Sequence, residues 1–189
     1  TDQDDIPLFD TSDFDFTFSQ LFRENRFNGI DRIGDANQVT VALTSRLIDG
    51  ESGRENLNLS VGNIIYFEDR KVNLVRGVTE TGTFSNVIAE LNGQLTENFS
   101  FQSGMQWDPE SGKFDRGEAS IRYRNNLNQI FNLGYRLRQN SPIDANNLEQ
   151  TNISFRFPIY DSWNLVGRWQ YSILRETTLE SFVGLEKES

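Results

Sequence analysis

Residues 98–107 read NFSFQSGMQW and residues 131–138 read FNLGYRLR, so that apolar and polar side chains alternate at nearly every step. Successive side chains of a β-strand point to opposite faces of its sheet, which gives each stretch one apolar and one polar face. The same alternation runs from about Val39 to the end of the chain, with apolar residues nearly always at odd numbers. This pattern predicts an antiparallel sheet with one apolar and one polar side.

Nine segments of this kind follow one another, joined by connections rich in Asp, Asn, Gly, Ser and Pro, which are typical of turns. The segments cover residues 37–48, 54–67, 83–95, 98–108, 113–124, 128–138, 149–158, 163–174 and 178–187. If every connection is a hairpin, the two longer ones, around 68–82 and 139–148, lie at the same end of the sheet. Short turns at one rim and longer loops at the other are typical of outer-membrane β-barrels. The predicted fold class is therefore all-β, an antiparallel transmembrane β-barrel segment.

Residues 1–36 differ from the rest and are expected to form an acidic N-terminal segment and an ordered loop, ahead of the barrel strands at 37–189. Phe14, Phe16 and Phe18 alternate with polar residues and predict one short strand. The loop interpretation rests on the Asn, Asp, Gly and Arg residues between Leu21 and Gln38. The chain begins in an acidic stretch with no basic-then-apolar leader, so we expect an internal piece of a longer protein.

Composition excludes several classes of function. The net charge of −10 argues against nucleic-acid binding, which depends on cation–phosphate contacts. The absence of Cys and His removes disulfides, thiolate metal sites and the usual general base. No nucleotide-binding, hydrolase or zinc-protease motif is present, and the acidic residues lie mostly in turns and in the N-terminal segment. We therefore predict neither enzyme activity nor a cofactor nor a metal site.

The apolar face has two physical solutions: it closes on a core in a soluble barrel, or it faces lipid. The strand-end aromatics favour lipid, because such rings collect at both membrane interfaces. The residues predicted to face lipid are Leu57, Leu59, Val61, Phe101, Met105, Leu133, Tyr135, Phe155, Leu165 and Trp169. The predicted interfacial aromatics are Phe67, Phe99, Trp107, Phe157, Trp163 and Tyr171.

The polar face is predicted to be basic although the chain as a whole is acidic. Its even-numbered arginines, called here the arginine set, are Arg46, Arg116, Arg122, Arg124, Arg136, Arg138, Arg156 and Arg168. Guanidinium groups suit planar contact with phosphate or carboxylate, so the set is a candidate wall for an anionic glycolipid or an acidic partner. Pairing with acids of a plug, a partner or other strands is an equal alternative. A second candidate group, expected to be fixed inside the lumen, is Arg26, Asp31, Arg32, Asn37 and Gln38.

Several stretches also carry a resemblance to a known family: IPLFDTSDFDFTFSQ (6–20), LFRENRFNGIDRIGDANQVTVALTSRLIDGE (21–51), NLNLSVGNIIYF (56–67), FPIYDSWNLVGRWQY (157–171) and LESFVGLEKES (179–189). They resemble the C-terminal barrel region of the LPS-assembly outer-membrane proteins (LptD) of Gram-negative bacteria. The most specific part is D-R-I-x-x-A-N-Q at residues 31–38, whereas 70–82 and 108–150 match weakly. By this comparison the chain is a fragment without the periplasmic jellyroll domain, the first and final strands and a cysteine pair expected just past Ser189.

The resemblance implies a large barrel in the outer membrane that delivers lipopolysaccharide to the outer leaflet. The partners that it implies are outer-membrane lipid, lipopolysaccharide cargo, a plug lipoprotein, a periplasmic bridge and the barrel-assembly machinery during folding. The pattern alone leaves two alternatives open, a porin-like or usher-like barrel for other cargo and a soluble lipid-binding β-barrel.

Overall fold

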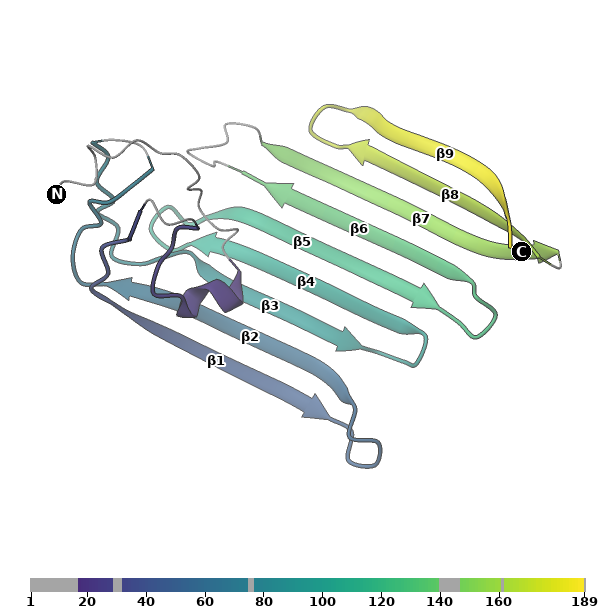
Figure 1. Ribbon diagram of the computed structural model, residues 1–189, viewed down its shortest axis with the longest axis horizontal. Helices are drawn as coiled ribbons and strands as arrows, with labels where there is room; N and C mark the ends of the chain where they lie inside the picture. Colours follow the sequence, from purple (N-terminus) through teal and green to yellow (C-terminus); the bar gives the residue numbers. More distant parts are fainter. Residues whose placement is uncertain (1–16, 29–31, 75–76, 140–146, 161, 189) are drawn as a thin grey trace. The chain divides into compact units, whose positions relative to one another are not determined.

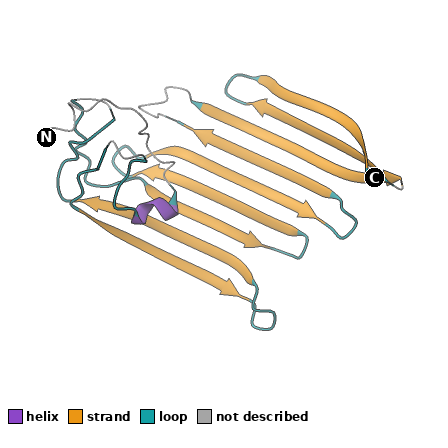
Figure 2. Ribbon diagram, in the orientation of Figure 1, coloured by secondary structure: helices purple, strands orange, loops and turns teal. Residues whose placement is uncertain are grey.

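The computed structural model describes residues 17–28, 32–74, 77–139, 147–160 and 162–188, and within them one 3₁₀ helix precedes nine β-strands (Figures 1 and 2). The helix is η2 (Phe18–Phe22). The strands are β1 (Gln38–Ile48), β2 (Glu55–Tyr66), β3 (Val87–Gln94), β4 (Phe99–Asp108), β5 (Lys113–Arg124), β6 (Ile130–Arg138), β7 (Leu148–Tyr160), β8 (Trp163–Ser172) and β9 (Thr177–Lys187). No helix among these residues is long and apolar enough to cross a membrane.

The nine strands belong to one sheet in which each strand pairs with the next along the chain, from β1 to β9 (Figure 1). The predicted all-β class is confirmed, and each predicted segment contains a strand. The largest difference is at β3, which begins at Val87 rather than at residue 83. Residues 83–85 still contact β2, but the Ser85 hydroxyl accepts the Ile64 N–H in place of a regular ladder bond (2.8 Å). Closure of the sheet into a barrel remains a prediction.

The chain divides into two compact units. Unit 1 contains the described parts of Thr1–Leu43, Ser60–Ala89 and Trp107–Lys113. Unit 2 contains Thr44–Leu59, Glu90–Gln106 and the described parts of Phe114–Ser189. The long connections and η2 of the candidate site belong to unit 1, and the regular ladders from β5 to β9 belong almost entirely to unit 2.

The register of the ladders in unit 2 separates apolar from polar residues. Ile121, Leu133, Ile153 and Trp169 lie directly opposite one another across β5, β6, β7 and β8. One residue along, the row is Arg122, Asn132, Ser154 and Arg168. Because cross-strand partners share a face, odd-numbered residues form an apolar face and even-numbered residues a polar face. We keep these two names below.

Two irregularities shift this numbering at the edge of the ladders. Between β8 and β9 the register shifts next to Gln170, so that even-numbered Thr178 lies opposite Tyr171 on the apolar face. Between β7 and β8 it shifts after Pro158, which places Tyr160 opposite Trp163. A bulge adds one residue to one strand and so reverses the face of every residue beyond it. Assigning faces from odd and even residue numbers alone therefore puts both residues on the wrong face.

In β2 the even-numbered residues are not all polar, because another element packs on them. Ser60, Gly62 and Ile64 of β2 are buried and even-numbered. Leu21 of η2 packs with Ile64 and with Ile88 of β3, so η2 covers the polar face of these strands. A Cβ at position 62 would lie 2.5 Å from a methyl carbon of Leu21, so the close approach of η2 requires glycine there.

The short strand predicted from Phe14, Phe16 and Phe18 is not formed at Phe18, which instead begins η2. Phe14 and Phe16 lie outside the described residues. Phe18 packs beside the cluster of Leu21 and Ile64, and its ring meets that of Phe22 edge-on at 5.7 Å. Burial of a helical turn against the sheet therefore outweighs the local two-residue alternation.

Two hairpin turns share the sequence D-x-E-S-G. Gly53 donates its N–H to the carbonyl of Asp49 at 2.9 Å, and Gly112 donates to Asp108 at the same distance. Both glycines have positive φ, 69° and 70°, a conformation that costs other residues free energy. The Asp49 carboxylate also accepts the N–H and the hydroxyl of Ser52, both at 2.7 Å. The aspartate and glycine at the two ends of the turn therefore stabilise each hairpin.

Candidate functional site

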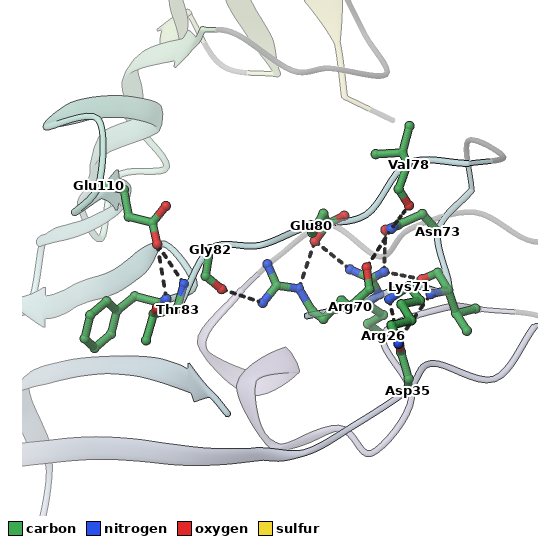
Figure 3. Close-up of polar contacts among 12 residues, drawn as sticks. Arg26, Asp35, Arg70, Lys71, Asn73, Val78, Glu80, Gly82, Thr83 and Glu110 are labelled. Carbon is green, nitrogen blue, oxygen red and sulfur yellow. Dashed lines mark hydrogen bonds and ion pairs between the residues drawn. The ribbon is translucent and has the colours of Figure 1, made fainter. Parts of the chain in front are cut away.

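Polar side chains gather in unit 1 between residues 23–37, which follow η2, and the β2–β3 connection at residues 67–86 (Figure 3). We call these contacts the polar junction. The two segments are far apart in sequence, and neither forms a regular strand or helix with the other. Side-chain hydrogen bonds and ion pairs therefore supply most of the contacts that join them.

Glu80 is the shared acceptor of the polar junction. Its Oε2 atom accepts hydrogen bonds from Nε of Arg70 and from Nη1 of Arg26, each at 2.9 Å. Arg70 also donates to the carbonyl of Gly82 at 3.0 Å, and its guanidinium carbon lies 3.6 Å from the centre of the Tyr66 ring. One carboxylate thus neutralises two arginines, one from each segment (Figure 3).

Asn73 organises the connection from within. Its amide nitrogen donates to the carbonyls of Arg70 (3.0 Å) and Val78 (2.7 Å), which holds these two residues on either side of Asn73. Its amide oxygen accepts Nη2 of Arg26 at 2.5 Å, and the same nitrogen also donates to the carbonyl of Val72. The three acceptors of Arg26 belong to Val72, Asn73 and Glu80, and they lie close together only when the connection is folded. Arg26 therefore stabilises the folded form of the connection.

Arg32 is almost completely buried, with 1% of its surface exposed. Its Nη1 atom donates to the carbonyl of Asn73 at 2.5 Å. Asn25 holds the loop around it: its side chain donates to the carbonyl of Arg32 (3.0 Å) and accepts the N–H of Gly34 (2.9 Å). Burial of a guanidinium costs free energy unless the group is paired, so the fold depends on the hydrogen-bond acceptors that surround Arg32.

Two further contacts extend the junction toward β1. The Asp35 carboxylate accepts the N–H of Lys71 at 2.6 Å. The Asn37 side chain donates to the carboxylate of Glu68 at 3.0 Å, on an exposed part of the surface. Together with the contacts above, they attach the N-terminal segment along most of the β2–β3 connection.

Glu110, in the second D-x-E-S-G turn, fixes the far side of the same connection. Its carboxylate accepts the N–H of Thr83 at 2.8 Å (Figure 3). A Cβ at Gly82 would lie 3.1 Å from both carboxylate oxygens of Glu110, so a larger residue there would push against this contact. The β4–β5 turn therefore also supports the connection.

The predicted lumen group is placed as follows. Arg26 and Arg32 lie in the polar junction, Asn37 lies at its edge, and Gln38 begins β1. Asp31 lies outside the described residues. Sequence reasoning left Asp35 out of the lumen group, and it missed Glu80, Arg70 and Asn73 because it treated residues 68–82 only as a long connection. Their signal was the alternation of acids, bases and amides in EDRKVNLVRGVTETG at 68–82.

Most of the arginine set has partners in the sheet. Arg156 binds Glu186 (2.8 Å) and Glu188 (3.2 Å), and Arg168 lies 3.5 Å from Glu180. Arg46 lies 3.9 Å from Glu55, Arg122 donates to Asn132 at 3.1 Å, and Arg116 and Arg138 make interactions of their own. The side chains of Arg124 and Arg136 make no hydrogen bond or ion pair within the described part of the chain.

The predicted interfacial aromatics lie at or near strand ends. Phe99 begins β4 and Trp163 begins β8, while Phe67 follows the last residue of β2. Phe157 stacks on Phe155 (5.6 Å between ring centres) and Tyr171 on Trp169 (5.4 Å), while the Phe99 ring is tilted against that of Tyr123 (4.7 Å). Trp107 is the residue before the end of β4 and is half-buried.

The geometry of the polar junction supports attachment and charge pairing. Within the described ranges, no three His, Cys, Asp or Glu side chains are grouped as metal ligands. The acids of the polar junction each accept hydrogen bonds from backbone N–H, guanidinium or amide groups. The junction can therefore hold residues 23–37 in place over the sheet.

Comparison with known proteins gives one consistent result over the whole chain. The LPS-assembly protein LptD of Nitrosococcus oceani is 42% identical over 188 residues, covering 100% of this chain and 25% of that protein. The LptD proteins of Methylococcus capsulatus and Xanthomonas euvesicatoria are each 40% identical, over 99% and 100% of this chain. The chain spans only 21–25% of the length of these relatives. The model of the family LptD, LPS transport system D, matches residues 1–163, and the chain therefore belongs to the LptD family.

Proposed function

We propose that the chain is part of the C-terminal region of the transmembrane β-barrel of an LPS-assembly protein in the outer membrane of a Gram-negative bacterium. In this proposal the apolar face contacts lipid and the polar face lines the aqueous interior. The whole barrel delivers lipopolysaccharide to the outer leaflet and changes no covalent bond in it. Its partners are a plug lipoprotein, the periplasmic bridge of the transport machinery and, during folding, the barrel-assembly machinery.

The observation that carries the proposal is the exposed apolar face. Ile121, Leu133 and Trp169 are 45%, 38% and 39% exposed, although they lie in one continuous row across the ladders. Among the described residues the buried hydrophobic side chains are Leu21, Phe27, Ile64 and Ile88, which all belong to unit 1. Unit 2 thus has a wide apolar surface without a core, and lipid is the solvent that such a surface fits.

The polar face supports the same orientation. Arg156 and Arg168 are paired with acids of β9 or just beyond it, and Asn132 donates to the Ser154 hydroxyl at 3.0 Å. Charges and amides of this density would be costly against hydrocarbon but are stable against water. The apolar face carries the hydrophobic rows and the polar face carries the ion pairs, which is the division that a membrane barrel needs.

The position of η2 refines the proposal. Leu21 packs on the polar face of β2 and β3, and Thr40 donates its hydroxyl to the carbonyl of Leu21 at 2.8 Å. If the polar face lines the interior, residues 17–28 and 32–37 are folded inside the barrel. The polar junction then holds this segment within the interior instead of leaving it free at the rim.

The deciding experiment uses the full-length parent protein isolated from membranes. We expect it to require detergent and to co-purify with a lipoprotein of the lipopolysaccharide-transport machinery. A protein that stays monomeric and folded in plain buffer would instead be a soluble lipid-binding barrel. Detergent dependence without any transport lipoprotein, together with unchanged surface lipopolysaccharide after depletion of the protein, would point to a porin-like or usher-like barrel.

A further inference from the structure

The apolar face changes character at one end of β7, β8 and β9. Phe157, Leu165 and Leu185 form a row of cross-strand partners. The next row toward the β7–β8 turn consists of Tyr160, Trp163 and Lys187, which the register pairs in the same way. The shift after Pro158 is what brings Tyr160 into this row, since regular pairing would have put Ile159 there.

Lys187 is a cation at the edge of the apolar face. Its Nζ atom lies 5.9 Å from the centre of the Trp163 ring, and it makes no ion pair within the described residues. The acids next to it in sequence, Glu186 and Glu188, both bind Arg156. Because neighbouring residues of a strand point to opposite faces, both carboxylates lie with Arg156 on the polar face and do not neutralise Lys187.

The polar atoms of the two aromatic residues are also available. Tyr160 is 78% exposed and Trp163 is 39% exposed, and neither the phenol nor the indole N–H makes a hydrogen bond within the described part of the chain. Elsewhere on the same face such atoms are satisfied: Trp169 donates to the Thr178 hydroxyl at 3.2 Å, and the Tyr135 hydroxyl bonds Glu149 at 2.8 Å. The row therefore presents three unused donors at one boundary.

We propose that Tyr160, Trp163 and Lys187 form a binding site for the phosphate of a membrane phospholipid. The inference rests on the proposed function, because it takes the apolar face to contact lipid. A lysine is tolerated on such a face near the membrane interface and is costly at its centre, so this row marks the interface. The ammonium and the two neutral donors bind the phosphate oxygens, and the acyl chains lie along Phe157, Leu165 and Leu185.

A soluble acidic protein is a poorer occupant for this row. The adjacent row, about 7 Å away along the strands, is entirely apolar, and Leu185 is 62% exposed. A phospholipid combines an anionic phosphate with two hydrocarbon chains, and so it matches both rows at once. The spacing of the two rows fits a single amphipathic molecule.

The test is native mass spectrometry of the detergent-solubilised parent protein, titrated with dioleoyl phosphatidylglycerol. Dioleoylglycerol, which has the same chains and no phosphate, is the matched lipid. We expect Lys187→Met to weaken phosphatidylglycerol binding by about tenfold, as expected for loss of a charge-assisted hydrogen bond. Tyr160→Phe and Trp163→Phe should weaken it a few-fold each. Lys113→Met removes a lysine at the start of β5 and should leave binding unchanged.

Equal binding by wild type, K187M and K113M would overturn the proposal, as would binding of dioleoylglycerol as tight as that of phosphatidylglycerol. Heat-modifiable electrophoretic mobility confirms that each variant is folded. If K187M fails to fold, Y160F and W163F still test the site, because each variant keeps an aromatic side chain and removes one donor. A wild-type protein that is stable without detergent and binds neither lipid would contradict the proposed function itself, which is a different outcome from a wild type that binds lipid without using Lys187.

Discussion

Gly167 of β8 lies directly opposite Phe155 of β7, and the phenylalanine ring covers the space where a side chain at position 167 would be. A Cβ there would come within 2.5 Å of the ring. The same arrangement is present between Gly93 of β3 and Phe101 of β4, where the corresponding distance is 2.6 Å. In both cases an aromatic ring packs on the bare backbone of a neighbouring strand, which protects that backbone and fixes the register.

Gly167→Ala should therefore destabilise the sheet by about 1–3 kcal/mol, because the Phe155 ring has to leave a well-packed position. Denaturant unfolding of the parent protein in micelles measures the change. Phe155→Leu should lower the cost of the alanine when the two substitutions are combined. Gly184→Ala is the matched control, since its Cβ would be 3.8 Å from Val166, an ordinary contact. Equal effects at 167 and 184 would contradict the role of the ring.

Glu80→Gln should loosen the polar junction. The substitution removes the negative charge shared by Arg26 and Arg70, of which Arg70 is only 10% exposed. Because Glu80 is itself 43% exposed, we expect a moderate cost of about 1–2 kcal/mol. Hydrogen exchange of peptides covering residues 67–86 should become faster.

Glu97→Gln is the control for that experiment. Glu97 is 82% exposed and lies 3.7 Å from Arg54, so its ion pair is expected to contribute little. If E80Q and E97Q leave exchange in residues 67–86 equally unchanged, Glu80 does not hold the polar junction together.

The first D-x-E-S-G turn should respond to acid. The pKa of Asp49 lies below its ordinary value because its carboxylate accepts hydrogen bonds from the N–H and the hydroxyl of Ser52. A carboxyl with a depressed folded pKa stabilises the fold above its unfolded pKa and loses that contribution as the pH falls through the folded pKa. The amide resonances of Ser52 and Gly53 should shift in that acidic window in ¹⁵N-labelled protein and remain flat in Asp49→Asn. A pH-independent Ser52 resonance in the wild type would contradict this account.

The sheet could be predicted from the sequence because strand alternation and turn residues depend only on positions that are close in the sequence. Leu133 and Asn132 point to opposite faces by geometry alone, whatever their neighbours are. Turn chemistry is equally local, as Asp49 and Gly53 show. The strand boundaries and the division into an apolar and a polar face therefore follow from single-residue alternation.

The candidate site could not be predicted in the same way. The contact of Glu80 with Arg26 joins residues 54 positions apart, and no spacing rule connects them. Phe18 alternates like a strand residue but turns into η2, because burial beside Leu21 is a tertiary effect. The bulge that moves Tyr160 depends on the pairing of β7 with β8, which only coordinates reveal. Long-range partners and register shifts are the two features that alternation does not contain.

Leu133→Arg tests the orientation of the two faces. If the apolar face contacts lipid, an arginine near the middle of β6 should cost on the order of 2–4 kcal/mol. Asn132→Arg places the same side chain on the polar face and should be mild. The measurement is the amount of heat-modifiable, folded barrel and its unfolding in denaturant. Equal tolerance at 132 and 133 would mean that the apolar face does not lie against hydrocarbon.

The arginine set contains two kinds of residue, and charge reversal should separate them. Arg156 is bound by Glu186 and Glu188, so Arg156→Glu would bring three acids together and should lower the amount of folded barrel. Arg136 faces Glu118 and Gln150 across the ladders and makes no ion pair within the described residues. Arg136→Glu places a second acid opposite Glu118, but the site is exposed and the cost is small, so the folded amount should stay close to that of the wild type. If the polar face guides an anionic glycolipid, the variant should slow its appearance at the cell surface. Surface labelling of lipopolysaccharide after a pulse measures this rate. Normal delivery in R136E, with normal folding, would reduce the arginine set to ion-pair support for the sheet.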